Sequence, residues 1–161
     1  MNLPENDFQI LKLTDAFYKA FPNQRYSEIL EKKQRAYKCL LFQTHYEFFI
    51  CIPYRSEISH PFAFLFKKSQ RSHRHKSGLD YTKIIIINKN EFIDNKDAII
   101  DKDEYIETIK HIEKIKKDAL TYVETYMRHI AKIKIMDLHK FKRQYGYSTL
   151  KYFHKELGLK T

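Results

Sequence analysis

Four consecutive isoleucines at residues 84–87 constrain the fold of this 161-residue chain more than any other feature. They lie in the segment 81–88 (YTKIIIIN), and an unbroken β-branched run of this kind predicts a strand that is buried on both faces. Such a strand needs neighbouring strands along its edges and packed layers over its faces. The rest of the chain must therefore supply further strands and helices that cover them.

Four more strand-like segments lie in the first half of the chain, at residues 8–13, 35–43, 47–53 and 61–67. The second and third are apolar and aromatic runs separated by three residues, which predicts a hairpin. Between the first and second, Thr14 and Asp15 are expected to begin a short helix that carries Phe17 and Phe21. Cys39 lies in one of the apolar runs and Cys51 in another. Both are expected to be buried thiols rather than a disulfide.

The second half of the chain is predicted to be helical. From Asp101 to about Lys132, apolar residues recur close to a helical period, at Tyr105, Ile109, Ile112, Leu120, Val123 and Ile130. Two further helices are expected, one at residues 136–145 that stops at Gly146 and one that begins after Ser148 and ends before Gly158. Strands followed by helices predict one α+β domain over residues 1–161, built around an antiparallel sheet.

The charge balance favours a polyanionic partner. Thirty Lys and Arg face 20 Asp and Glu, which gives a formal net charge of +10 and a pI near 9.4. Such a field attracts nucleic acid, whereas solubility alone is the competing interpretation. The sequence contains no run of roughly 18 apolar residues, so no membrane span is predicted. Because no basic region followed by an apolar stretch begins the chain, we expect a cytoplasmic protein.

The first candidate site follows the strand predicted at residues 47–53. Arg55, Ser56 and His60 come directly after this strand, and a strand end holds side chains rigidly while leaving them open to a substrate. Arg55 is a candidate phosphate clamp, and His60 is a candidate proton carrier near neutral pH. Ser56 lacks the G-x-S-x-G surroundings of an esterase nucleophile. A turn with solvent-facing polar groups is the alternative.

The second candidate site is the basic segment 67–78, which contains no acid. Its five cations are candidates to neutralise phosphates, with Lys76 also a candidate for charge relief in catalysis: Lys67, Lys68, Arg71, Arg74 and Lys76. Lys83 opens the isoleucine strand and is a further candidate RNA contact. The alternative is a solvated charged loop in which Asp80 pairs with a neighbouring cation. His73 and His75 lack acidic or cysteine neighbours, so we expect no metal site here.

Two other regions offer cations to RNA. Arg35 begins the first hairpin strand and is expected near Arg55, where two adjacent cations would favour an anion between them. In residues 139–158, cations that include Lys142 and Arg143 alternate with aromatic residues, a combination that suits single-stranded RNA. Two amphipathic helices with aromatics inward and lysines outward are the alternative there. No phosphate-binding glycine loop is present, so no nucleotide cofactor is expected.

Three segments resemble the ToxN/AbiQ/TenpN family, the toxins of type III toxin–antitoxin systems: IPYRSEISHPFAF (52–64), KSGLDYTK (76–83) and YSTLKYFHKEL (147–157). The resemblance implies a twisted antiparallel sheet wrapped by helices, as in MazF-like ribonuclease toxins. It also implies metal-independent cleavage of mRNA at A-rich sites with 2′,3′-cyclic phosphate ends. The implied partner is a small repetitive pseudoknot RNA antitoxin, which the toxin cuts from its precursor and which inhibits it in a hetero-oligomeric protein–RNA assembly. Such systems act in phage defence by abortive infection.

The resemblance assigns residues one by one. Ser56 matches the active-site serine of the family, and Lys83 matches the lysine that leads into the core strand. Arg55 replaces a threonine of the founding ToxN branch, and Arg35 replaces a lysine. Ile58 stands where that branch has a second lysine, so His60 or Lys76 is expected to take its role.

The expected reaction is attack by the 2′-hydroxyl of the RNA on the adjacent phosphorus. Arg35, Arg55 and Lys76 are expected to relieve charge, Ser56 to orient the phosphate, and His60 to act as acid or base. A non-catalytic nucleic-acid-binding module explains the charge equally well. A helical scaffold for an acidic protein partner is a second alternative.

Overall fold

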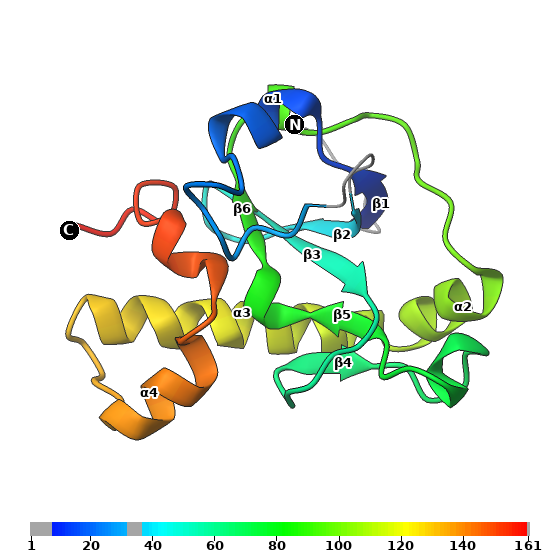
Figure 1. Cartoon of the computed structure of the whole chain (residues 1–161). Helices are drawn as coiled ribbons and strands as arrows, with labels where there is room; N and C mark the ends of the chain where they lie inside the picture. The colour runs from blue at the N-terminus through cyan, green and yellow to red at the C-terminus, as the bar shows by residue number, and fades with distance from the viewer. Residues whose placement is uncertain (1–7, 32–36, 161) are drawn as a thin grey trace.

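The computed structural model describes residues 8–31 and 37–160 of the chain. In these ranges the fold is α+β, with an open antiparallel sheet of six strands and four α-helices (Figure 1). The strands are β1 (Phe8–Lys12), β2 (Lys38–Gln43), β3 (Phe49–Arg55), β4 (Ala63–Leu65), β5 (Gly78–Asp80) and β6 (Ile85–Ile87). The helices are α1 (Asp15–Ala20), α2 (Lys102–Lys110), α3 (Ile112–Ile130) and α4 (Leu138–Tyr145).

Strand β3 lies at the centre of the sheet. One edge of β3 pairs with β2, and β1 lies beyond β2. Its other edge pairs with β6 near the start of the strand and with β5 near the end, and β4 lies beyond β5. Every residue of β3 except Arg55 is buried. The predicted hairpin of β2 and β3 is thus confirmed, and the only partly exposed residue of β3 is an arginine at its end.

The chain that pairs with β3 through β5 and β6 leaves the sheet between these two strands. Tyr54 pairs with Leu79 and Cys51 pairs with Ile85, so two residues of β3 (52–53) face five residues of the neighbouring segment (80–84). The extra residues form a short 3-10 helix, η2 (Tyr81–Lys83). Pro53 lies within this stretch, and a proline fits a central strand most easily where the partner strand departs.

The prediction of one strand over residues 81–88 was therefore wrong at its beginning. Only Ile85–Ile87 form a strand. The physical reason is the side chain of Asp80, whose Oδ1 accepts hydrogen bonds from the backbone N–H and the Oγ1–H of Thr82, at 3.0 and 2.6 Å. These bonds stabilise a turn at the position where the apolar pattern alone indicates a continuous strand.

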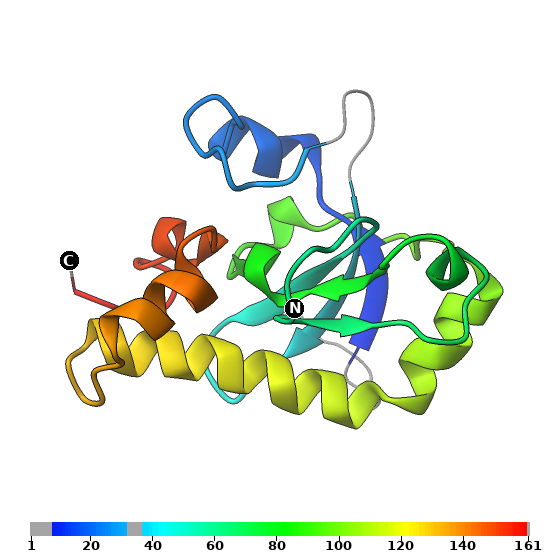
Figure 2. The same ribbon diagram turned by 60° about the horizontal axis from the view of Figure 1, so that its bottom comes forward.

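Helix α3 runs along one side of the sheet, and α1 lies on the opposite side (Figure 2). The buried side chains of α3 form one stripe at helical spacing: Ile115, Ala119, Tyr122, Val123 and Tyr126. The buried hydrophobic residues of the sheet and helices form a single cluster. Cys39 and Cys51 belong to this cluster and are free thiols, as expected. None of the described helices combines the length and the apolar character needed to span a bilayer.

Two helical predictions needed correction. The helix expected from Asp101 to about Lys132 is interrupted at His111, whose backbone (φ −114°, ψ 19°) leaves the helical region. In α2, Tyr105 and Ile109 are exposed, although the apolar pattern placed them in the core. The buried residues of α2 are instead Glu104, Glu107 and Thr108, because the acidic side chains bind the segment that precedes β5.

The C-terminal region agrees with the predictions in part. Helix α4 ends at Gly146, as expected. The side chain of Ser148 accepts a hydrogen bond from the backbone N–H of Leu150, so it caps a helical segment as predicted. This segment is the short 3-10 helix η4 (Thr149–Tyr152), followed by turns, rather than an α-helix.

Candidate functional site

The polar residues at the end of β3 meet around one buried carboxylate, that of Asp80. Its side chain is 0% exposed. Oδ2 accepts a hydrogen bond from Arg55 Nη1 at 2.9 Å, and Nε2 of His60 lies 3.1 Å from Oδ1. Oδ1 also accepts the two bonds from Thr82 described above. A buried charge is tolerated only with partners of this kind, so Asp80 fixes the positions of the three side chains around it.

Strand pairing explains how these residues meet. Arg55 pairs with Gly78, and Asp80 follows Gly78 by two residues, so both side chains lie on the same face of the sheet. Gly78 lies between Arg55 on β3 and Leu65 on β4. A Cβ atom at position 78 would lie 1.9 Å from the carbonyl oxygen of Phe64, so only glycine allows this close approach.

His60 has both ring nitrogens occupied. Nδ1 accepts a hydrogen bond from the backbone N–H of Phe62 at 3.1 Å, so this nitrogen carries the lone pair. Nε2 therefore carries the hydrogen, which points toward Oδ1 of Asp80, with Oγ1 of Thr82 at 3.3 Å. In this arrangement His60 supports the buried carboxylate and presents no free lone pair to a substrate.

Lys83 lies beside the same cluster, at the end of η2. Its ammonium donates a hydrogen bond to the carbonyl oxygen of Tyr147 at 2.8 Å. Burial lowers the pKa of Lys83; the nearby Asp80 carboxylate opposes this effect, and the Arg55 guanidinium adds to it. Lys83 therefore loses its proton more readily than a surface lysine does. This property suits a group that moves protons.

Ser56 and Lys76 lie on two neighbouring segments next to the cluster. The backbone N–H of Ile58 donates to the carbonyl oxygen of Lys76 at 2.8 Å, which brings the two segments together. Glu57, between Ser56 and Ile58, has a φ of 58°, a left-handed conformation that is uncommon for a residue with a side chain. In the described ranges the hydroxyl of Ser56 and the exposed ammonium of Lys76 have no hydrogen-bond or ion-pair partner. Both groups remain available to a ligand.

The basic segment before β5 is bound to α2 through its backbone. The carboxylate of Glu107 accepts hydrogen bonds from the backbone N–H groups of Lys67 and Lys68, the shortest at 2.9 and 2.7 Å. Asp103 accepts one from the backbone N–H of Gln70 at 2.7 Å. These acids bind the backbone of the segment, and residues Lys67 and Lys68 are exposed.

The two arginines of the basic segment differ. Arg71 Nη2 lies 3.0 Å from Oδ2 of Asp101, and its Nε lies 3.9 Å from Oε2 of Glu104, so acids already balance its charge. Burial raises the pKa of Glu104, and the Arg71 guanidinium opposes that effect. Arg74 is exposed, and it has no acidic partner in the part of the chain that the structure describes. Of the two, Arg74 is therefore better placed to contact an anion.

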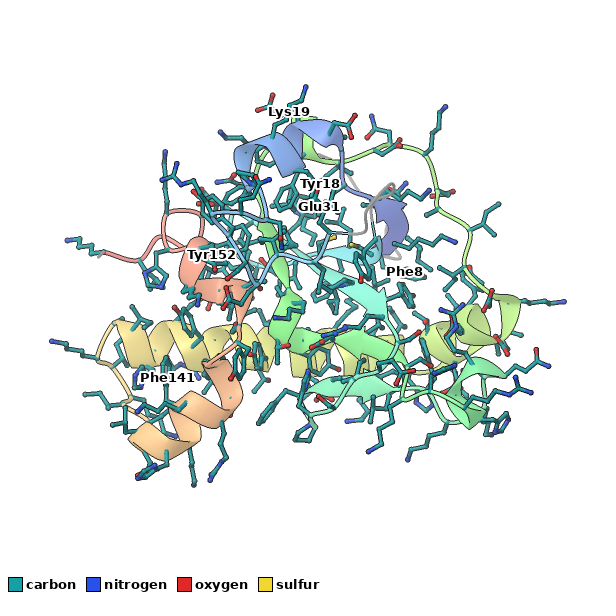
Figure 3. The ribbon with its side chains drawn as sticks, viewed as in Figure 1. Phe8, Tyr18, Lys19, Glu31, Phe141 and Tyr152 are labelled. Carbon is teal, nitrogen blue, oxygen red and sulfur yellow. The ribbon has the colours of Figure 1, made fainter. Side chains whose placement is uncertain are left out.

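The remaining predicted RNA contacts lie elsewhere. Lys142 and Arg143 are exposed on α4, which lies at the far end of α3 from α2 (Figures 1 and 2). Phe141, labelled in Figure 3, lies on α4, and its ring centroid is 4.0 Å from that of His129; Tyr145 is buried. The aromatic residues of α4 thus lie inward and its cations outward, which agrees with the amphipathic-helix alternative given for this region. Arg35 lies outside the described residues.

The sequence did not predict the roles of two members of the cluster, Asp80 and Thr82. Asp80 was expected only to pair with a nearby cation, and Thr82, although part of the motif 76–83, was given no role of its own. The signal that would have found both is the spacing D-Y-T at residues 80–82. An aspartate commonly binds the backbone and hydroxyl groups two residues later in a turn.

No family model matches the sequence, and neither a curated protein nor a solved structure matches the chain. Within residues 8–31 and 37–160, no group of three or more His, Cys, Asp or Glu side chains is arranged to hold a metal ion. The assignment of a function therefore depends on the geometry of the cluster and on the sequence motifs.

Proposed function

We propose that this chain is a metal-independent endoribonuclease whose active site is the group of side chains around Asp80. The observation that carries this proposal is the ion pair of Arg55, at the end of β3, with the buried Asp80, which Lys83 follows by three residues at the end of η2. Ser56 adds an unpaired hydroxyl and Lys76 an unpaired ammonium. The site has a surplus of positive charge, which suits an RNA phosphate.

The proposed reaction uses the 2′-hydroxyl of the RNA as nucleophile. A bond forms between the 2′-oxygen and phosphorus, and the bond between phosphorus and the 5′-oxygen breaks. The products are a 2′,3′-cyclic phosphate and a 5′-hydroxyl. The reaction needs a base for the 2′-hydroxyl, an acid for the leaving oxygen, and donors for the charge that builds on the phosphate.

Arg55 is the proposed phosphate clamp. A guanidinium has five N–H donors, and the bond from Nη1 to Asp80 leaves others for phosphate oxygens. Each well-placed donor contributes ~10²–10³ in rate. Ser56 donates a further hydrogen bond to the phosphate. Asp80 and His60 act as positioning residues, because Asp80 binds Arg55 and His60 binds Asp80.

Lys83 is the proposed base, and Lys76 the proposed acid. The lowered pKa of Lys83 enlarges the fraction of neutral amine that accepts the proton of the 2′-hydroxyl. The exposed Lys76 ammonium, beside the Ser56 turn, gives a proton to the leaving 5′-oxygen. This division replaces the expectation that His60 moves the proton, since both nitrogens of His60 are engaged.

The biological role that we propose comes from the sequence motifs. We propose a cytoplasmic toxin of a type III toxin–antitoxin system that cuts mRNA and its own antitoxin precursor, with a sheet related to MazF-like ribonucleases. A small repetitive pseudoknot RNA would inhibit it in a hetero-oligomeric assembly and release it during phage infection. Tandem short repeats immediately upstream of the reading frame would support this role. Their absence would argue against it.

The test is incubation of purified protein with A-rich RNA in EDTA. We expect cleavage by the wild type and by a Lys19→Ala control, which removes an exposed cation of α1. We expect cleavage to be reduced at least ~10²-fold by Arg55→Ala, the loss of one charge-stabilising donor. The competing function, a non-catalytic RNA-binding module, is favoured by the formal charge of +10. RNA that is bound but stays intact with the wild-type protein would select that alternative.

A further inference from the structure

A cavity lies beside the edge strand β4. Its volume is about 300 Å³, near the lower end of the ~300–1,000 Å³ typical of small-molecule pockets. Its lining is mainly carbon and consists of Phe64, Leu65, Lys67, Lys68, Glu107, Lys110, His111 and Lys114. A cavity of this size fits a single flat ring system with its substituents.

Two aromatic rings form part of this lining. Phe64 is half-buried on β4, and His111 lies at the break between α2 and α3. Their ring centroids are 5.3 Å apart and their planes differ by 43°. In the described ranges the ring nitrogens of His111 have no hydrogen-bond partner. The pair therefore offers aromatic faces for stacking together with nitrogens that are free to bind the edge of a polar ring.

The mouth of the cavity is strongly cationic. Lys67, Lys68 and Lys110 are exposed and have no acidic partner among the described residues, whereas Lys114 pairs with Asp118 at 2.7 Å. Among the described residues of the lining, Glu107 is the only acid, and both of its oxygens already accept backbone hydrogen bonds. A ligand with negative charge on both sides of a flat, apolar centre would match this distribution.

We infer that this cavity, the Phe64–His111 pocket, binds one unstacked base of single-stranded RNA while the surrounding lysines bind the flanking phosphates. Aromatic faces accept any base, and cations near the mouth follow the backbone. The inference rests on the proposed function, because it places the pocket on the RNA strand that is cut. It adds a specificity subsite that is separate from the Asp80 cluster.

The register of the sheet places the two sites within reach of one strand of RNA. Ala63 on β4 pairs with Asp80, and Phe64 is the next residue. β4 is separated from β3 by β5 alone, which amounts to two strand spacings, or ~10 Å. Neighbouring residues of a strand point to opposite faces, so the RNA would pass around the edge formed by β4 between the active site and the pocket.

Binding of an uncut RNA tests the pocket without requiring catalysis. The probe is a fluorescein-labelled 2′-O-methyl oligoadenylate of about ten nucleotides, within the ~4–16 that a single-stranded binding site covers. It has no 2′-hydroxyl and cannot be cleaved by the proposed reaction. A series of probes carries one abasic nucleotide at each position in turn. Anisotropy titrations give the affinity of every probe for each protein variant.

We expect one or two adjacent abasic positions to weaken binding to the wild type by about tenfold, the size of one base–aromatic stack. Phe64→Leu and His111→Gln should each weaken binding of the intact probe by a similar factor. In these variants the abasic penalty should disappear, because the same contact is already lost. Tyr105→Ala, which removes an exposed aromatic from α2, should leave both measurements unchanged.

Two results would overturn the inference. One is an abasic penalty that is the same in Phe64→Leu and His111→Gln as in the wild type, with circular dichroism showing that both variants are folded. The other is the absence of any position-specific penalty, with the probe displaced instead by an acidic peptide. Neither result touches the proposed function, which is judged by cleavage of ordinary RNA. Conversely, a wild type that shows the penalty but cuts no RNA would retain the pocket and reject the nuclease.

Discussion

Replacing Asp80 with asparagine is expected to weaken the fold as well as the site. The variant keeps the side chain's shape, and its oxygen can still accept hydrogen bonds from Thr82 and His60. Its amide would face Arg55 Nη1, so a charge-assisted bond of 2.9 Å becomes a contact between two donors. A hydrogen bond to a charged group contributes about 1.5–3 kcal/mol, and solvent reduces this value because the Arg55 side chain is 27% exposed.

We therefore expect Asp80→Asn to lower the free energy of unfolding by about 2 kcal/mol, which corresponds to a fall in Tm of about 4–8 °C for a chain of this length. Urea titration followed by circular dichroism measures the difference. The matched control is Asp118→Asn, which removes a more exposed partner of Lys114 and should change stability by less than ~0.5 kcal/mol. A loss for Asp80→Asn as small as that of the control would refute the claim that this carboxylate organises the site.

Three further predictions follow from other contacts. His60→Gln should keep most of the cleavage activity that His60→Ala loses, because the glutamine amide can still donate to the buried carboxylate. Equal loss of activity in the two variants would instead indicate that His60 transfers the proton. Gly78→Ala should lower the free energy of unfolding by about 1–3 kcal/mol in urea titrations, because its Cβ would lie 1.9 Å from a carbonyl oxygen, and an unchanged midpoint would contradict the strand packing described here. Burial alone would raise the pKa of Glu28, but hydrogen bonds from Tyr152, Ser27 and Lys151 lower it to about 2, from 4.5. The stabilisation from these bonds is complete above pH 4.5 and is lost as the pH falls toward 2. In acid titrations, the wild type should therefore lose stability over this range, and Glu28→Gln should lose less. Parallel stability curves for the two proteins would show that these contacts do not couple to protonation.

Much of the sheet could be predicted because its strands follow the alternation of side chains or the density of apolar residues. The hairpin of β2 and β3 and the strand β6 are of this kind. The departure of residues 81–84 from the sheet could not be predicted in this way. It depends on hydrogen bonds from Thr82 to the side chain of Asp80, which the isoleucine run conceals.

Helix α2 shows a second limit of pattern analysis. Its apolar residues recur at helical spacing, yet Tyr105 and Ile109 lie on the exposed side. The inward side is decided by Glu107, which satisfies backbone N–H groups of a distant segment. Hydrophobic periodicity contains no information about such a partner. The same contact keeps the basic segment against α2, so it also shapes the Phe64–His111 pocket.

The sequence predicted that some of the candidate residues would lie together, but not what each of their atoms contacts. Arg55 and His60 were expected to converge, and both contact the same carboxylate. The roles of individual groups could not be predicted, because they depend on what each atom contacts. His60 has both nitrogens occupied, and Lys83 has a pKa lowered by burial, two properties that only packing reveals.

The central claim is that the 2′-hydroxyl of the substrate performs the attack, with protein side chains in place of a metal. The most direct measurement uses a DNA strand that carries a single ribonucleotide, incubated with the protein in EDTA, with the fragments identified by mass spectrometry. The account predicts one cut, directly after the ribonucleotide, that leaves a 2′,3′-cyclic phosphate. Cleavage at the deoxynucleotides, or an absolute need for added divalent metal, would contradict it.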